Sequence, residues 1–239
     1  MYRIVEKRQL SELVFMMKIQ APLVAESRQP GQFVILQVDA DWGERIPLTI
    51  ADADPVAGTV TIAFQPVGYS TKLLATKEVG DELPAFLGPL GNPSEIENFG
   101  HVVCVGGGFG TAPLYPIVKA LKEAGNKVTV IIGYRNKGLI IMEDEMKAVA
   151  DEVVVMTDDG SYGRQGVVTI PLKEMCESAA PPRPRHRHRS ADHDEVLRRD
   201  DAPLRHQDDR LPQHDHDRRH GHVRRLPRGH RRRNEVCLR

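Results

Sequence analysis

The sequence predicts a β + α/β protein, in which a six-stranded antiparallel β-barrel is followed by a truncated parallel α/β domain and a disordered tail. Three observations lead to this fold class. Residues 1–98 are short alternating or β-branched segments between Gly and Pro turns, a pattern typical of a small barrel. Residues 99–178 alternate strand and helix patterns, which indicates a parallel sheet covered by helices. Residues 179–239 contain no Ile, Phe, Tyr, Trp or Lys and bury too little apolar surface to fold.

The predicted barrel contains one helix, Ser70–Thr76, which follows Val67-Gly68-Tyr69. Ser70 and Thr71 lie where the helix begins, so their hydroxyl and backbone N–H groups either cap the helix or hold a phosphate. The six predicted strands, in chain order, are Tyr2–Gln9, Leu13–Ile19, Gln32–Val38, Ile46–Ala51, Thr59–Gln65 and Glu82–Leu87.

The α/β region opens with VVCVGGGFGTAPLYP at residues 102–116, an apolar strand that ends in a glycine-rich turn before a helix. Glycines let a backbone approach a phosphate closely, and a helix N-terminus favours negative charge, so this turn predicts a nucleotide site. Thr111 replaces the third glycine of G-x-G-x-x-G, and a purely structural turn is the alternative. The helices expected after it are 114–124, 141–150 and 167–176, the strands are 128–132 and 152–157, and the loops at the strand ends are 106–111, 133–137 and 158–163.

Charge also separates the tail from the rest of the chain. Residues 1–178 hold 16 Lys and Arg against 23 Asp and Glu, whereas residues 179–239 hold 17 against 10 and nine of the ten histidines. Three scattered cysteines exclude a disulfide framework. Neither a signal peptide nor an apolar run of membrane-spanning length is found, so we expect a cytoplasmic protein with no membrane and no nucleic-acid partner.

Several motifs, RIPLTIAD, QPVGYSTKLL, FLGPLGNP, GGGFGTAPLYP, GYRNK and TDDGSYGRQG, together resemble the ferredoxin-NADP reductase-type flavoprotein superfamily. Within it, residues 1 to about 177 are similar to the electron-transfer subunit of dihydroorotate dehydrogenase. They are more similar still to the small FAD/[2Fe-2S] subunit of NADH-dependent ferredoxin:NADP oxidoreductase, also called sulfide dehydrogenase. The resemblance implies an FAD-binding barrel at 1–98, an incomplete NAD(P)-binding domain at 99–178 and an aberrant Arg/His-rich tail at 179–239.

The resemblance also implies cofactor positions. Thr49 would lie beside the flavin N5 and Arg45 would meet the pyrophosphate, although Ile46 occupies the family's arginine position and a surface arginine is the alternative. No acid or base residue is expected, because the cofactors carry hydride transfer and the protein aligns their rings. The FAD positions are Arg45, Pro47, Leu48, Thr49, Phe64, Gln65, Gly68, Ser70 and Thr71, and the nicotinamide-nucleotide positions are Gly106, Gly107, Gly108, Gly110, Thr111, Asp158, Asp159 and Gly160.

The nicotinamide substrate is either NAD or NADP. Tyr134, Arg135 and Lys137 stand where an NAD-specific acid is usual, and they either accept a 2′-phosphate or form a solvated loop. The implied partners are a larger flavoprotein subunit, in a heterodimer or heterotetramer, and a ferredoxin-like acceptor.

The family carries a [2Fe-2S] cluster in a cysteine-rich C-terminal segment, whereas Cys176 and Cys237 have no partner at ferredoxin spacing, so we expect no metal site. Reading the codons of residues 183–228 one base later permits a strand, a Gly-Pro turn and a C-x-x-C, and we favour a frameshift over a genuine tail. The lost segment would leave an exposed apolar edge near Val153–Met156. We predict an electron-transfer flavoprotein subunit between NAD(P)H and a partner flavoprotein or ferredoxin. The alternative is a non-catalytic nucleotide-binding module with a basic nucleic-acid- or metal-binding tail.

Overall fold

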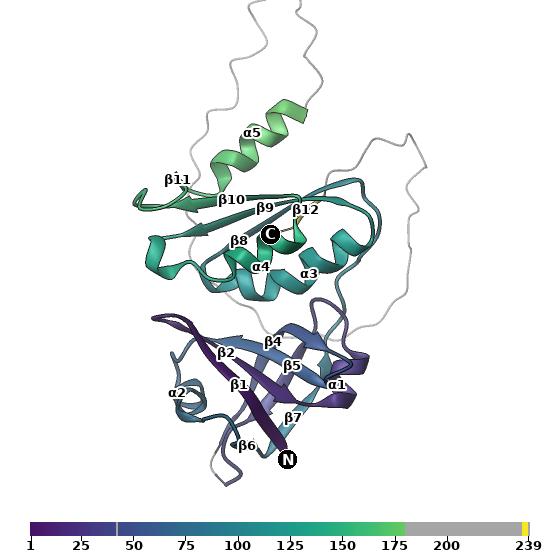
Figure 1. Ribbon diagram of the computed structural model, residues 1–239, viewed down its shortest axis with the longest axis vertical. Coiled ribbons are helices and arrows are strands. Elements are labelled where there is room, and N and C mark those ends of the chain that lie inside the picture. The colour runs from purple at the N-terminus through teal and green to yellow at the C-terminus, as the bar shows by residue number, and fades with distance from the viewer. Residues whose placement is uncertain (42, 180–235, 239) are drawn as a thin grey trace, which may run out of the picture. The chain divides into compact units, whose positions relative to one another are not determined.

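The computed structural model describes residues 1–41, 43–179 and 236–238 (Figure 1). It contains a seven-stranded, nearly closed antiparallel sheet followed by a parallel sheet with helices, which confirms the predicted fold class. The predicted disordered tail lies outside the described residues, except for the strand β12, Val236–Leu238. None of the described helices is long and apolar enough to cross a membrane.

The barrel closes through one bent segment of the chain. Strands β6 and β7 are separated by Pro84 alone; β6 pairs with β1 and β7 pairs with β3, so residues 82–90 join both edges of the sheet. The six predicted strands therefore correspond to six chain segments, the last of which is divided in two. The strands are β1 (Tyr2–Ser11), β2 (Val14–Gln20), β3 (Phe33–Gln37), β4 (Arg45–Asp54), β5 (Thr59–Phe64), β6 (Glu82–Leu83) and β7 (Ala85–Leu90), in the order β6-β1-β2-β5-β4-β3-β7.

The barrel core is filled by alternate residues of these strands. Burial of its large side chains, among them Ile4, Met17, Leu36 and Phe86, removes apolar surface from water and stabilises the fold. Two helices accompany the barrel. The predicted helix is α2, Tyr69–Thr76, whereas α1, Pro22–Ser27, was not predicted, because six residues are too few to display a helical period.

The α/β domain has helices on both faces of its sheet (Figure 1). Helices α3 and α4 pack on one face, against a core that includes Val102, Cys104 and Val130. Helix α5 packs on the other face, where Leu172 and Met175 accompany a smaller cluster. The elements are β8 (His101–Gly107), the 3-10 turn η1 (Gly108–Gly110), α3 (Thr111–Glu123), β9 (Lys127–Tyr134), the 3-10 turn η2 (Lys137–Leu139), α4 (Glu143–Val149), β10 (Glu152–Thr157), β11 (Arg164–Gln165) and α5 (Thr169–Ala179), and the sheet order is β11-β10-β9-β8-β12.

The predicted exposed edge at Val153–Met156 is wrong at Met156, which is paired, and none of the four side chains is exposed. Strand β11 pairs with Met156 and Thr157 and continues the sheet beyond β10, and the residues of the predicted edge are buried or half-buried. The strand that returns to the sheet is β12, which pairs in parallel with Val102–Cys104 of β8. From β8 to β11 the strands lie side by side in chain order, and β12 then joins on the other side of β8, so the strand order reverses at β8.

Asn126 fixes the linker between the two sheets at the amino ends of the parallel strands. Its Oδ1 accepts hydrogen bonds from the N–H groups of Phe99 (2.7 Å) and Gly100 (3.1 Å). Its Nδ2 donates to the carbonyl oxygens of Glu97 and Leu121, both at 2.8 Å. The buried amide is thus fully used, which ties the end of α3 to the chain that enters β8.

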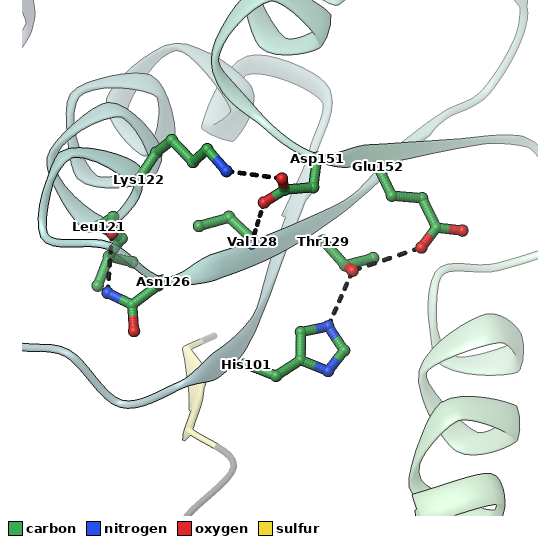
Figure 2. A network of polar contacts seen from close by, with 8 residues as sticks. All are labelled: His101, Leu121, Lys122, Asn126, Val128, Thr129, Asp151 and Glu152. Atoms are coloured by element: carbon green, nitrogen blue, oxygen red, sulfur yellow. Dashed lines mark hydrogen bonds and ion pairs between the residues drawn. The ribbon is translucent and has the colours of Figure 1, made fainter.

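Asp151 makes a second polar connection at the same edge (Figure 2). Its Oδ1 lies 2.6 Å from Lys122 Nζ, and its Oδ2 accepts the Val128 N–H at 2.7 Å. These bonds, that from Lys122 foremost, hold the pKa of the Asp151 carboxyl below its ordinary value. His101 Nε2 lies 3.0 Å from Thr129 Oγ1 nearby, so this edge is closed by internal polar contacts.

Candidate nucleotide-binding site

A cleft of about 460 Å³ opens at the carboxyl ends of β8, β9 and β10. Ligands of open parallel sheets bind at this end of the strands. Barrel residues also line the cleft, in the turn between β1 and β2 and directly after β5. The lining residues are Ser11, Leu13, Val14, Gln65, Gly107, Gly108, Phe109, Gly133, Tyr134, Arg135, Leu139 and Asp158.

The glycine-rich turn leaves space in front of its backbone. Gly108 has a φ of +52°, which favours glycine, and a Cβ placed there meets no atom within 4 Å. A Cβ on Gly110 also meets nothing within 4 Å, so no neighbouring protein atom requires glycine there. Gly106 differs, because its Cβ would lie 3.0 Å from Leu114 Cδ2 and its glycine serves strand–helix packing. The turn fits a ligand that approaches the backbone at Gly108 and Gly110.

Two of the predicted side chains at the carboxyl ends of the strands, Tyr134 and Thr111, form hydrogen bonds within the protein. Tyr134 Oη lies 2.8 Å from Thr111 Oγ1 and 2.9 Å from the carbonyl oxygen of Ile141. The carbonyl can only accept, so the phenol donates to Ile141 and accepts the Thr111 hydroxyl proton. Burial raises the pKa of the Tyr134 phenol. The Thr111 backbone N–H bonds to the carbonyl oxygens of Gly108 and Phe109, so both polar groups of Thr111 that the sequence offered to a ligand are used within the protein.

The loops after β9 and β10 are tied to each other. The Lys137 N–H donates to Ser161 Oγ at 2.8 Å, and Lys137 Nζ lies 5.5 Å from the centre of the Tyr162 ring. Asp159 accepts the Ser161 N–H at 2.9 Å, and its bonds to Ser161 lower the pKa of its carboxyl. Gly160, at a φ of +71°, completes this turn.

Arg135 and Asp158 are the charged side chains that line the cleft. Both are exposed, at the ends of neighbouring strands. Of the three residues predicted at the end of β9, Arg135 and Tyr134 line the cleft, but the Tyr134 hydroxyl is bonded within the protein, and Lys137 contacts the loop after β10.

In the barrel, the predicted flavin positions on β4 lie on both faces of the strand. Arg45 and Pro47 are exposed and Thr49 is half-buried, while Leu48 packs against the barrel core, as does Ile46. The Ile50–Ile62 pair is the last of the β4–β5 ladder. Thr49 and the carboxyl end of β5 therefore lie at the same end of this strand pair.

At the end of β5, the two predicted FAD positions, Phe64 and Gln65, differ in their access to the cleft. The Phe64 side chain is buried in the barrel core, 5.9 Å from the Phe15 ring between centroids, so only its backbone is open to a ligand. Gln65 lines the cleft. The barrel thus brings Gln65 to the nucleotide cleft and keeps Phe64 inside.

The N-terminus of α2 is suited to an anion. The Gly68 N–H donates to Thr71 Oγ1 at 3.0 Å, and the Gly68 carbonyl accepts the Lys72 N–H at 2.9 Å. The N–H groups of Tyr69, Ser70 and Thr71 precede this first helical bond and have no acceptor within the helix. Ser70 is 6% exposed, and its Oγ is the one buried side-chain polar atom of the described residues without a hydrogen-bond partner. Free N–H groups beside an orphaned hydroxyl fit a phosphate group.

The described residues contain no group of three or more His, Cys, Asp or Glu that could hold a metal ion. Cys104 is buried in β8 and Cys176 is exposed on α5. Sequence reasoning missed Ser11, Leu13 and Leu139 in the cleft lining. No local pattern marks them, because turns that are distant in sequence reach the cleft only through tertiary packing.

The chain is similar to known electron transfer subunits. It is 51% identical over 172 residues to the dihydroorotate dehydrogenase B (NAD(+)) electron transfer subunit homolog of Thermotoga maritima, across 72% of this chain and 60% of that protein. It is 36% identical over 177 residues to the dihydroorotate dehydrogenase B (NAD(+)) electron transfer subunit of Geobacillus thermodenitrificans, across 72% of this chain and 68% of that one. The chain thus spans 60% of the length of the first relative and 68% of the second. No protein-family model matches it.

Solved structures agree with these relatives. The NADH-dependent reduced ferredoxin-NADP oxidoreductase, solved to explain flavin-based electron bifurcation, superposes with a TM-score of 0.69 and 46% identity, across 74% of this chain and 63% of that one. The ferredoxin reductase of carbazole 1,9a-dioxygenase has a TM-score of 0.61 at 21% identity, across 74% of this chain and 56% of that one, a likeness of fold. The resemblance inferred from the motifs is confirmed.

Proposed function

Because the chain belongs to the family of dihydroorotate dehydrogenase B electron transfer subunits, we propose that it is an FAD-containing subunit that passes electrons between NADH and a partner oxidoreductase. The proposed cofactor regions are residues 1–98 for FAD and 99–178 for the nicotinamide nucleotide. NADH is proposed over NADPH because the name of the first relative specifies NAD(+); the matched oxidoreductase is called NADH-dependent, and its name also includes NADP.

The observation that carries this proposal is a single cleft bounded by both proposed sites. Gln65, a proposed FAD position at the same end of the β4–β5 pair as Thr49, lines the same cleft as Gly107 and Gly108 of the glycine-rich turn. Hydride transfer requires donor and acceptor rings at about 3–3.5 Å, so the two cofactors must share one space. A non-catalytic nucleotide-binding module has no need of that arrangement.

Each part of the chain has a role in this chemistry. When bound, FAD supplies the two-electron acceptor and the one-electron donor that the reaction requires. The N–H groups at the start of α2 and the Ser70 hydroxyl hold its phosphates, and Thr49 accepts or donates a hydrogen bond at the ring edge. The backbone at Gly108 and Gly110 admits the nicotinamide dinucleotide, with its phosphates at the start of α3.

The charged residues of the cleft support the choice of NADH. Asp158 offers a carboxylate that accepts hydrogen bonds from ribose hydroxyls and repels a 2′-phosphate, whereas Arg135 alone would favour the phosphate. The tie between Lys137 and the Ser161–Tyr162 loop leaves Arg135 as the single cation among the cleft-lining residues. We propose that Asp158 decides between the two nucleotides.

The partner is proposed to be a larger oxidoreductase subunit, as the relatives' designation of electron transfer subunit implies for them. A ferredoxin-like acceptor belongs to the same proposal. A [2Fe-2S] relay is not part of it, because neither Cys176 nor Cys237 has a second cysteine at ferredoxin spacing.

Absorbance of the purified full chain tests the proposal. We expect flavin bands, about one FAD released per chain on denaturation, and bleaching of the bands by NADH under anaerobic conditions. NADPH should bleach them more slowly, and Asp158→Asn should narrow the difference between the two. A colourless protein that FAD does not reconstitute would refute the proposal in favour of a nucleotide-binding module. Bound FAD that neither nucleotide reduces would refute the electron-transfer role alone.

A further inference from the structure

Two apolar side chains lie beside the proposed phosphate-binding start of α2, and neither packs into the barrel core. Val67 and Tyr69 are 78% and 73% exposed. A hydrogen bond from the Val67 N–H to the Gln65 carbonyl, 2.9 Å long, closes a tight turn after β5 and directs the chain away from the barrel.

The backbone sets these two side chains side by side. Gly68 between them is extended, with φ −104° and ψ 175°. Side chains on either side of an extended residue project in the same direction, so Val67 and Tyr69 lie on one face of the loop. A Cβ on Gly68 would have only Thr71 Oγ1 within 4 Å, at 3.9 Å. The face between Val67 and Tyr69 is therefore open to a flat group.

The same loop holds the groups suited to a phosphate. The free N–H of Tyr69 belongs to the residue whose ring is exposed, and Ser70, with its orphaned hydroxyl, follows directly. Helical side chains lean toward the helix N-terminus, which directs the Ser70 hydroxyl to the same end. A ligand that places a phosphate on these donors brings the group attached to that phosphate beside the Tyr69 ring.

We propose that Tyr69 and Val67 form the seat of the adenine ring of FAD, so that this loop selects the dinucleotide FAD over the mononucleotide FMN. The inference rests on the proposed flavin site and adds to it a residue that distinguishes the two flavins. Aromatic side chains stack on bases through the ring face alone, so the phenol hydroxyl of Tyr69 contributes nothing to the selection.

Calorimetric titration of the full-length apoprotein with FAD and with FMN tests this selection. Tyr69→Ala should weaken FAD binding about 5- to 150-fold, the range of base stacking on aromatic residues, and change FMN binding less than about twofold. Tyr69→Phe should bind FAD as the wild type does. Val56→Ala, which removes another exposed apolar side chain, is the matched control.

Equal losses of FAD and FMN affinity in Tyr69→Ala would overturn the inference, because the ring would then serve a part common to both flavins. Unchanged FAD affinity would overturn it as well and assign Tyr69 to another surface. Wild-type protein that binds neither flavin would refute the proposed function itself. Because Tyr69 is exposed, Tyr69→Ala should not unfold the protein. A thermal transition of the variant equal to that of the wild type would show that a loss of FAD affinity does not come from unfolding.

Discussion

The proposed position of the FAD phosphates at the start of α2 can be tested by a substitution that introduces one negative charge. Thr71→Glu places a carboxylate in the first turn of the helix without removing its cap. Thr71 now accepts the Gly68 N–H, and a glutamate three residues after the N-cap makes the same bond in a capping box. A negative charge there also favours the helix itself. A loss of FAD affinity in Thr71→Glu would therefore report on the phosphates rather than on an unfolded helix.

The size of the effect follows from Coulomb's law. Because Gly68 and Tyr69 at the start of α2 are exposed to solvent, we take an effective dielectric constant of about 40, between the value of about 20 for pairs near a protein surface and that of water. A carboxylate about 5 Å from one phosphate charge and about 8 Å from the other then costs about 1.7 and about 1.0 kcal/mol. Together these repulsions weaken FAD binding about 100-fold.

Titration of the apoprotein with FAD at low and high salt measures this effect. Thr71→Gln is the control, because it keeps the shape and the cap of the glutamate variant without the charge, and it should bind FAD within about threefold of wild type. At 1 M salt the Debye length is about 3 Å, so the defect of Thr71→Glu should shrink severalfold. Wild-type affinity in Thr71→Glu, or an equal loss in both variants, would contradict the placement of the phosphates.

Three further predictions concern other parts of the chain. Gly108→Val should abolish reduction by NADH while FAD stays bound, whereas Gly80→Val, at another positive φ with open space, should leave reduction unchanged; normal reduction in Gly108→Val would refute the assignment of the loop. Asp151→Asn should destabilise the protein in urea at neutral pH. Because the folded state lowers the pKa of this carboxyl, the difference from wild type should persist above about pH 4 and vanish as the pH falls through the lowered pKa; a difference that grows in acid would contradict this. Iron and acid-labile sulfide should be absent from protein of this sequence, and stoichiometric amounts would refute the frameshift interpretation.

The sequence predicted those elements whose residues carry a local period. Strands β1 to β5 and helices α3 to α5 were found because apolar residues recur at two- or near four-residue spacing. Strand β5 shows where such patterns fail. Its burial covers both faces, since Phe64 enters the barrel core while Ala63 joins the cluster of the α/β domain. Without a polar face, alternation cannot tell which side chain of the strand meets a ligand.

The individual roles of the site residues depend on contacts between loops distant in sequence. Tyr134 and Lys137 looked like Arg135 in the sequence, as three neighbours at one strand end. The structure separates them, because Tyr134 bonds to Thr111 on α3 and Lys137 contacts the loop after β10. Such partners are 23 and 24 residues away, beyond any local pattern.

The two ends of the α/β sheet differ in whether their polar groups already have partners within the protein, and the barrel contains one further polar group without a partner. At the amino ends of the strands, the Asn126 amide and the Asp151 carboxylate have all the partners expected of a structural role. At the carboxyl ends, the loops after β9 and β10 are already tied together, yet the backbone at Gly108 faces open space. In the barrel, the Ser70 hydroxyl is buried without a partner. The polar groups without a partner belong to segments whose conformation is already fixed by other hydrogen bonds. A ligand can therefore form hydrogen bonds with them without immobilising these segments, which lowers the entropy cost of binding.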